Sequence, residues 1–460
     1  MQVAAHRMKP TVSVIIPVYN SEATLRQCLE HLRAGSKLPL ECIVVDDGST
    51  DGSGELAEKL GARVLRTDGR RGPAHARNLG ARAAQGEVVF FLDADVCVHA
   101  DTVARVERAF EEDPELDALI GSYDTSPGAK DFLSQYKNLM HCFVHQQSRR
   151  EACTFWSGCG AIRREVFLQH AGFDESYERP AIEDIELGYR LRAAGRKVIL
   201  DKDLQVKHLK RWTFWGLLKT DILDRGIPWT ELILRDHYMP NDLNLEISQR
   251  VSVALAFSLV AVAIAAAFYW GAYFLVPLMA LLVLILSRYW LEFAHGPRSG
   301  FVLALFGALV GVIVWLAVEH RVKHVVYPLI LGCLLLLLRD RTEGRSKRWN
   351  RVVELVISVY IVAVVVYMGA RLPYHWIIFA FFVIGALLLV LNQRFYRFLA
   401  ARRGRLFALA AVPFHILYHL YNGFSLAAGI VHYSWMRLTR KREQDPQKSA
   451  ASQAPALKGR

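Results

Sequence analysis

Four aspartates follow short apolar runs of the sequence. Asp46 and Asp47 end one run, and Asp93 and Asp95 directly follow another. If both runs are strands of a parallel sheet, these carboxylates meet beyond the strand C-termini, where such sheets bind ligands. The Asp-x-Asp pair places two hard oxygen ligands on one edge, which suits Mg²⁺ or Mn²⁺ bridging a diphosphate.

A second acidic pair, Glu183-Asp184, opens a segment whose apolar positions recur with helical spacing. Acids at a helix N-terminus complement the helix dipole by roughly 0.3–1 kcal/mol, and we expect only that role for Glu186. A carboxylate there can also remove a proton from an acceptor hydroxyl. The dipole lowers the pKa of such a carboxylate, whereas burial and an acidic neighbour raise it, and the sequence leaves the balance open.

These acids belong to a regular alternation of elements. Short apolar runs at 11–17, 41–47, 63–65 and 86–92 read as strands, and helical segments separate them. Strands that alternate with helices predict a parallel, doubly wound α/β sheet.

Four motifs occur in order: VIIPVYN at 14–20, VVDDGSTD at 44–51, GPAHARNLG at 72–80 and FLDAD at 91–95. Together they resemble the family 2 glycosyltransferases of the GT-A fold, over about residues 11–235. The resemblance implies a nucleotide-sugar-binding α/β domain and inverting sugar transfer from a nucleotide-diphosphate sugar, with a UDP-sugar favoured.

The resemblance also implies roles for individual residues. Asp47 would hold the nucleotide base, and Asp95, with Asp93 nearby, would hold Mg²⁺ or Mn²⁺. Asp184, beside Glu183, would be the general base. The nucleotide and diphosphate pocket would be lined by Pro17, Tyr19 and Arg77.

Two further segments resemble parts of the same family. The loop at 154–164 is similar to its acceptor side: Gly158 and Gly160 could let the backbone approach a sugar, and Trp156 could stack on one or be a core aromatic. The string HLKRW at 208–212 resembles the Gln-x-x-Arg-Trp motif of processive synthases. There Arg211 and Trp212 would hold the donor diphosphate, and His208, on the acceptor side, replaces the usual Gln. The basic residues of this string could equally contact anionic lipid.

The net charge and the cysteines argue against several classes of protein. The net charge is +12, but much of the excess lies in short loops between apolar runs, so we expect a lipid bilayer and no nucleic acid as partner. Seven scattered cysteines without a Cys-x-x-Cys pair argue against a disulfide framework or a zinc site.

The second half of the chain reads as membrane-embedded. We expect interfacial amphipathic helices at 211–248, followed by about six transmembrane helices within 249–392. The expected spans are 251–270, 272–288, 300–318, 323–338, 352–370 and 375–391. Basic loops at alternate ends place the catalytic domain and the C-terminus in the cytosol. The family implies the bacterial inner membrane.

The remaining boundaries complete the expected organisation. Residues 1–10 form an N-terminal arm, and 11–210 form the GT-A domain. Residues 393–436 would be a basic loop followed by a re-entrant hairpin, turning near Asn422-Gly423, or an interfacial segment. Residues 437–460 would be a disordered basic tail.

The expected activity is sugar transfer to a hydroxyl of a lipid-linked or polysaccharide acceptor at the cytosolic membrane face. A polyprenyl-phosphate sugar synthase is an alternative, although its anionic phosphate acceptor needs no base. A processive polysaccharide synthase is another, with the change at His208 against it. The non-enzyme alternatives are a membrane transporter and a scaffold with an inactive transferase domain.

Overall fold

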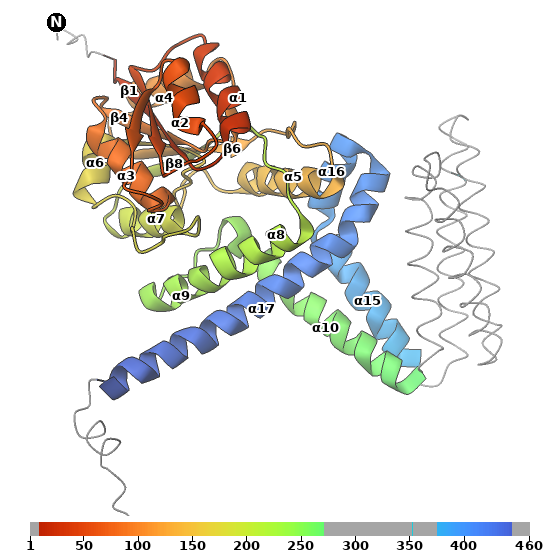
Figure 1. Ribbon diagram of the computed structural model, residues 1–460. Helices are drawn as coiled ribbons and strands as arrows, with labels where there is room; N and C mark the ends of the chain where they lie inside the picture. The colour runs from red at the N-terminus through yellow and green to blue at the C-terminus, as the bar shows by residue number, and fades with distance from the viewer. Residues whose placement is uncertain (1–8, 271–351, 353–374, 444–460) are drawn as a thin grey trace, which may run out of the picture. The chain divides into compact units, whose positions relative to one another are not determined.

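The computed structural model of the protein describes residues 9–270, 352 and 375–443 (Figure 1). The chain divides into two compact units, Met1–Arg250 with Arg394–Arg460, and Val251–Gln393. The expected spans at 272–288, 300–318, 323–338 and 352–370 lie outside the described residues, apart from Val352.

One eight-stranded sheet organises the first unit. Its strands are β1 Val12–Val18, β2 Glu41–Asp46, β3 Arg63–Arg66, β4 Val88–Leu92, β5 Val96–Val98, β6 Ala118–Tyr123, β7 Cys159–Arg163 and β8 Val198–His208. They lie in the order β3-β2-β1-β4-β7-β6-β8-β5. β1 to β4 pair in parallel as predicted, but β7 runs antiparallel to β4 and β6, and β5 antiparallel to β8. β6 and β8 also pair in parallel, so the prediction of a parallel sheet was wrong only for β7 and β5.

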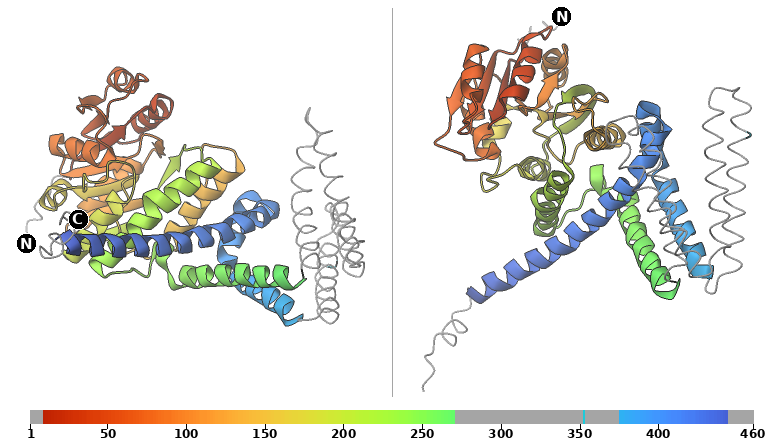
Figure 2. Two further views of the ribbon diagram at one scale, coloured as in Figure 1. Left: turned by 60° about the horizontal axis from the view of Figure 1, so that its bottom comes forward. Right: turned by 45° about the vertical axis from the view of Figure 1, so that its right-hand side comes forward.

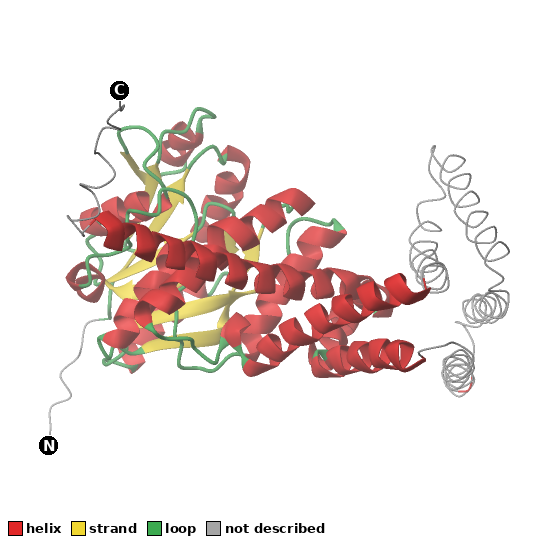
Figure 3. Cartoon of the chain, turned by 90° about the horizontal axis from the view of Figure 1, so that it is seen from below, coloured by secondary structure: helices red, strands yellow, loops and turns green. Residues whose placement is uncertain are grey.

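Helices cover both faces of this sheet (Figure 3). They are α1 Glu22–Arg33, α2 Ser53–Lys59, α3 Pro73–Ala83, α4 Thr102–Glu112, α5 Phe132–Gln147, α6 Arg164–Gln169 and α7 Glu183–Ala193. Successive strand side chains point to opposite faces, so Val14 packs in the core with α1 and α4, whereas Ile15 packs in the core with α3, α6 and α7. This two-sided burial fixes the register that places Asp93 and Asp95 just past β4.

After β8 the chain forms a second helical layer. α8 Phe214–Lys219, the π-helix η1 Thr220–Gly226 and α9 Ile227–Asp236 follow one another directly. After the short 3₁₀ turn η2 Leu243–Leu245 comes α10 Ile247–Trp270, and the described part resumes with α15 His375–Leu391, α16 Gln393–Arg403 and α17 Arg405–Glu443. The expected helices at 211–248 are present, and their place at a membrane surface stays a prediction.

The segment after residue 404 differs from its prediction. α17 is one continuous helix with Pro413 inside it, without a turn at Asn422-Gly423, and it runs into the expected tail (Figures 1 and 2). The residues at 393–403 are a helix and not a loop. Packing explains the continuity: an added Cβ on Gly226 would lie 2.6 Å from the Cβ of Ser425, and one on Gly429 would lie 2.6 Å from that of Thr230. Tertiary packing of this closeness outweighs local helix breakers.

The described part of the chain contains few helices that could cross a membrane. One helix there, Ile247–Ala266 within α10, is long and apolar enough to cross a bilayer. The bent pair of α15 and α16 would make a second span if counted as one.

Candidate active site

The Asp-x-Asp carboxylates lie at the rim of the sheet, between strands β4 and β5. Asp93 accepts a hydrogen bond from the Arg77 guanidinium of α3 at 2.7 Å. The Oδ2 atom of Asp95 lies 3.6 Å from Nε2 of His208 at the end of β8. Burial tends to raise the pKa of Asp95, but the hydrogen bond and charge of His208 outweigh it, so this pKa is lowered. Both carboxylates keep part of their surface exposed, as groups that receive a ligand must.

Arg77 joins this rim to the start of α7. Its side chain is buried and also donates to Glu183 at 2.9 Å. Burial alone would lower the pKa of Arg77, but the charges of Asp93 and Glu183 outweigh it and raise the pKa. The guanidinium stays charged and holds the strand end and the helix start together.

Asp184 occupies the first turn of α7 as predicted, and its carboxylate is fixed by three donors. Oδ2 accepts from the backbone N–H and the hydroxyl of Ser157 at 3.0 and 3.1 Å, and Oδ1 accepts from the N–H of Ile185 at 2.8 Å. Burial first, and the charge of Glu183 second, raise the pKa of Asp184 to about 6. Burial and the charge of Glu183 therefore outweigh the hydrogen bond from the Ser157 N–H and the charge of Arg77, both of which lower this pKa.

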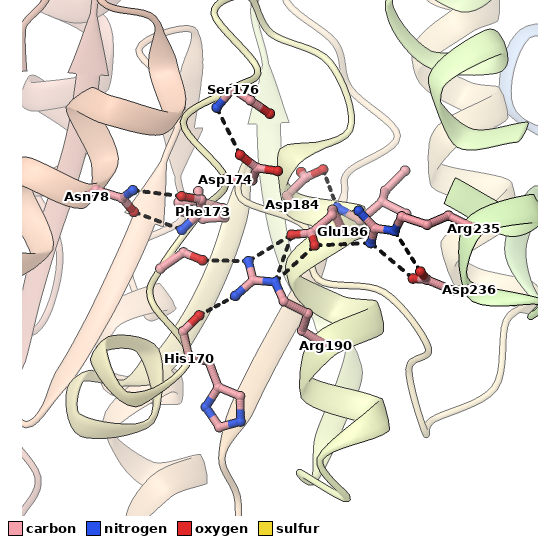
Figure 4. Close-up of polar contacts among 12 residues, drawn as sticks. Asn78, His170, Phe173, Asp174, Ser176, Asp184, Glu186, Arg190, Arg235 and Asp236 are labelled. Carbon is pink, nitrogen blue, oxygen red and sulfur yellow. Dashed lines mark hydrogen bonds and ion pairs between the residues drawn. The ribbon is translucent and has the colours of Figure 1, made fainter. Parts of the chain in front are cut away.

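A buried ion-pair network positions this helix turn (Figure 4). Glu186 accepts from Arg190 at 2.9 and 3.0 Å and from Arg235 of α9 at 3.3 Å. Arg190 also donates to the carbonyls of His170 and Gly172. Glu186 thus ties α7 to the preceding loop and to α9, beyond the dipole role that the sequence predicted for it.

We expect Glu186→Gln to lower the free energy of unfolding by about 1–3 kcal/mol, because a buried charged acceptor is lost while both arginines remain. Activity should fall with it, since Asp184 lies two residues away. Thermal unfolding of the purified protein measures the first effect. Glu165→Gln is the matched control, because among the described residues Glu165 bonds only Gln169, on an exposed helix face. Its effect on the free energy of unfolding should stay within about 0.5 kcal/mol. Equal stability of the two variants would contradict a positioning role.

The end of β8 brings an aromatic group to the same rim. His208 is buried, its Nδ1 lies 3.0 Å from Oδ1 of Asn138, and its ring stacks on Tyr123 with centroids 4.2 Å apart. Tyr123 meets Trp156 edge to face at 4.7 Å. The sequence offered no signal for Tyr123, because its strand β6 was not predicted.

Gly158 and Gly160 of the 154–164 segment leave no room for a side chain, because other atoms of the protein lie too close. An added Cβ on Gly158 would lie 2.9 Å from the ring of Trp156, and one on Gly160 would lie 2.4 Å from the Trp156 carbonyl oxygen. Trp156 is half-buried and packs against the cores on both sheet faces. The observed packing favours the core-aromatic interpretation of Trp156, and an acceptor role for this loop stays a prediction.

Arg211 and Trp212, the other two residues of the HLKRW string with a predicted role, lie in different surroundings. The Arg211 side chain is 81% exposed and lies 3.8 Å from Asp131. Trp212 is buried in a cluster with Tyr136 and Leu217. Arg211 is therefore not among the residues gathered around the carboxylates, whereas His208 is.

The nucleotide side of the rim lies at the ends of β1 and β2. Asp47 is buried and accepts from the N–H groups of Arg71 and Gly72 at 2.8 Å and from the hydroxyl of Thr67 at 2.9 Å. It therefore fixes the loop that leads into α3. Pro17 is half-buried, and Tyr19 is exposed with the Arg70 guanidinium 4.3 Å from its ring centroid. Arg70 was not predicted, and nothing in its sequence context marks it.

The donor set at the rim fits a hard divalent cation. Mg²⁺ is usually held by one or two carboxylates together with substrate phosphates and not by a cage of protein ligands. Asp93 and Asp95 supply such a pair. Within the described ranges no group of three His, Cys, Asp or Glu side chains could hold a metal.

Comparison with known proteins shows which family and which relatives this chain is similar to. Residues 13–170 match the family described as Glycosyl transferase family 2. Glycosyltransferase GlyG of Streptococcus pneumoniae serotype 4 is 34% identical over 121 residues, which cover 25% of this chain and 40% of that protein. The poly-beta-1,6-N-acetyl-D-glucosamine synthase of Staphylococcus aureus strain COL is 25% identical over 239 residues, covering 49% of this chain and 56% of that protein. Both matches span less than two thirds of the relative's length.

Among solved structures, the mannosyltransferase PcManGT from Pyrobaculum calidifontis in complex with GDP-Man and Mn²⁺ is similar, with a TM-score of 0.45 and 22% identity. The similarity covers 68% of this chain and 88% of that one.

Proposed function

We propose that this chain, whose residues 13–170 match the family described as Glycosyl transferase family 2, transfers a sugar with inversion from a nucleotide-diphosphate sugar to an acceptor hydroxyl. The observation that carries the proposal is the half-buried carboxylate of Asp184, which three donors fix in the first turn of α7 and whose pKa is raised to about 6. It lies in one constellation with the Asp93-Asp95 rim, because Arg77 bridges Asp93 to its neighbour Glu183. A general base works best with a pKa near the operating pH.

The proposed step is a single displacement at the anomeric carbon. Asp184 takes the proton of the acceptor hydroxyl, the hydroxyl oxygen forms the new glycosidic bond, and the bond to the donor diphosphate breaks with its electron pair on the diphosphate. Ser157 keeps one oxygen of Asp184 engaged and thereby orients the carboxylate. Arg77 stays ion-paired and keeps Glu183 from taking the proton.

The donor would bind across the strand ends. Asp93 and Asp95 would hold Mg²⁺ or Mn²⁺, which when bound neutralises charge on the diphosphate. The loop fixed by Asp47 and the exposed Tyr19 would flank the nucleotide, with a UDP-sugar as the favoured donor.

The acceptor and the location are also part of the proposal. We place a lipid-linked or polysaccharide acceptor at the cytosolic face of a bacterial inner membrane. The apolar helix α10, which follows α9 after the turn η2, supports the membrane location. A processive polysaccharide synthase is the second candidate, because a relative with that kind of name matches 239 residues of the chain. The length of the product separates the two.

The test uses the full chain purified in detergent, with Mg²⁺ or Mn²⁺ and a panel of nucleotide sugars, and measures released nucleoside diphosphate. We expect release with one donor and a rise on adding a membrane lipid extract. If no donor gave nucleoside diphosphate release and the protein bound no nucleotide, the scaffold or transporter alternatives would be favoured.

The raised pKa of Asp184 predicts how activity depends on pH. The base acts in its deprotonated form, so at saturating Mn²⁺ the kcat should fall about tenfold per pH unit below pH 6 and level off above it. A rate profile from pH 4.5 to 8 measures this. The residual rate of Asp184→Asn should lack that inflection, and an unchanged inflection in the variant would assign it to another group.

A further inference from the structure

A buried polar trio joins three segments that are far apart in the sequence. Oδ2 of Asp221, in the π-helix η1, accepts hydrogen bonds from Nζ of Lys137 in α5 and from the hydroxyl of Tyr421 in α17, both at 2.5 Å. All three residues are buried. A π-helix is rare and is often found at functional positions, and here it presents one carboxylate to both neighbouring helices.

Stability alone does not account for a buried charge pair at this place. Apolar residues of similar volume are often as stabilising as a buried ion pair, or more so, because desolvation of the charges offsets their attraction. Leu139 of α5 already packs in one apolar cluster with Leu399 of α16 and Tyr418 of α17. Such packing is non-directional, whereas a carboxylate oxygen that accepts from two donors requires one arrangement. The trio therefore sets the position of α5 relative to η1 and α17.

The next residue of α5 reaches from this trio to the carboxylates. Asn138 is buried; its Nδ2 donates to the carbonyl oxygen of Asp124 at 3.4 Å, and its Oδ1 lies 3.0 Å from Nδ1 of His208. A carbonyl can only accept, so the amide nitrogen faces Asp124 and the amide oxygen faces His208. Nδ1 of His208 is therefore the donor, and Nε2 is the ring nitrogen that faces Asp95.

An aromatic stack holds the His208 ring on another side. The ring is nearly coplanar with that of Tyr123, at an interplanar angle of 9° and a centroid separation of 4.2 Å. Together with the Asn138 contact, the stack gives the imidazole one orientation, in which Nε2 lies 3.6 Å from Oδ2 of Asp95. A displacement of α5 thus moves the imidazole and changes the surroundings of the Asp95 carboxylate.

We propose that Tyr421 is a positioning residue for the Asp93-Asp95 rim. Its hydroxyl holds α5 through the trio, and α5 holds the His208 ring beside Asp95. The C-terminal helix α17 thereby controls how tightly the rim holds a divalent cation, although it contributes no group to the rim itself. The inference rests on the proposed function in one respect, namely that Asp95 holds the cation.

Equilibrium binding of Mn²⁺ to the full-length protein in the presence of UDP tests the inference without requiring turnover. Free Mn²⁺ is measured by its electron paramagnetic resonance. The central variant is Lys137→Met/Asp221→Leu/Tyr421→Phe, which replaces the trio by apolar side chains of similar size. Tyr421→Phe alone removes one hydroxyl, and Asn138→Ala removes the contact at the other end of the same path.

Tyr396→Phe is the matched control, because it removes a hydroxyl from the same apolar cluster. That hydroxyl lies 3.0 Å from Nδ1 of His415 and, among the described residues, makes no hydrogen bond to the trio. Thermal unfolding of each variant shows whether it is folded.

We expect the triple variant to unfold at the wild-type temperature or above, because apolar replacement of a buried ion pair is often neutral or stabilising. Its affinity for Mn²⁺ should nevertheless fall about tenfold, the low end of the effect of removing an outer partner of a metal-binding group. At saturating Mn²⁺ the kcat should change little, because Asp184 keeps its three donors.

The smaller variants should follow the same path. Tyr421→Phe should show part of the loss of Mn²⁺ affinity, and Tyr396→Phe should bind Mn²⁺ like the wild type. Adding Asn138→Ala to the triple variant should cause no further loss, because changes that act through one contact are not additive.

Wild-type Mn²⁺ affinity in a folded triple variant would overturn the inference. An equal loss in Tyr396→Phe, or a wild-type protein that binds no Mn²⁺ with UDP, would do the same. If the triple variant does not fold, Tyr421→Phe compared with Tyr396→Phe decides the question. Failure of the proposed function looks different: no sugar is transferred, while the difference in Mn²⁺ affinity between these two single variants remains.

Discussion

Asp184→Asn should lower kcat for sugar transfer by roughly 10²–10⁴-fold, the usual contribution of a positioned general base. The amide keeps the shape of the side chain but cannot take the hydroxyl proton. Donor affinity should change little, because the contacts of Asp93 and Arg77 are untouched. Single-turnover transfer measured beside equilibrium UDP binding separates the two effects.

The stability of the same variant is an independent check. The pKa of Asp184 in the folded protein, about 6, lies above the ordinary value. The group therefore favours folding at low pH, and that contribution is lost as the pH rises through about 6. At pH 8 the charged carboxylate is unfavourable, so the neutral amide should not destabilise the fold strongly. The amide also places an NH₂ group against the N–H of Ser157 or Ile185. This repulsion offsets part of the stability gained by removing the charge. If the Asp184→Asn protein were misfolded, its loss of activity could not be assigned to the loss of the general base.

Asp95→Ala should abolish most metal-dependent release of nucleoside diphosphate, with a loss on the order of 10²–10³-fold. The side chain is 27% exposed and its ion pair is with His208, so its removal should leave the fold intact. Titration of Mn²⁺ in the presence of UDP, followed by the electron paramagnetic resonance of free Mn²⁺, measures the loss of binding.

Asp101→Ala is the matched control, because Asp101 lies on the surface and pairs with Arg105 at the start of α4. It should bind Mn²⁺ like the wild type. An Asp95→Ala protein that retained the wild-type Mn²⁺ affinity would remove the metal role from the rim.

The sequence predicted the parallel half of the fold because its signals are local. The β-branched runs at β1 and β2 and the apolar run at β4 are unmistakable, and Gly72-Pro73 marks the start of α3. β7 was missed because it lies inside a segment rich in glycine and aromatic residues. The continuity of α17 was missed because Pro413 and Gly423 are local breakers, whereas the packing of Ser425 and Gly429 is tertiary.

In the candidate site, too, the sequence predicted the residues with local motifs but not the contacts made by the folded chain. Motif spacing named Asp93, Asp95 and Asp184, and in the structure Arg77 joins Asp93 to Glu183, the neighbour of Asp184. The environment that sets the pKa of Asp184 depends on its burial and on a loop 27 residues away in sequence, which no local pattern encodes.

The most direct test of the account measures, in one reaction, the sugar transferred and the nucleotide released. Wild-type protein is incubated with the radiolabelled donor found by the panel, Mn²⁺ and a membrane lipid extract. The account predicts one labelled sugar in the lipid or polymer fraction for each nucleoside diphosphate released, and loss of both in Asp184→Asn. Nucleotide released without sugar in that fraction, or transfer that survives Asp184→Asn, would contradict base-assisted transfer to a hydroxyl.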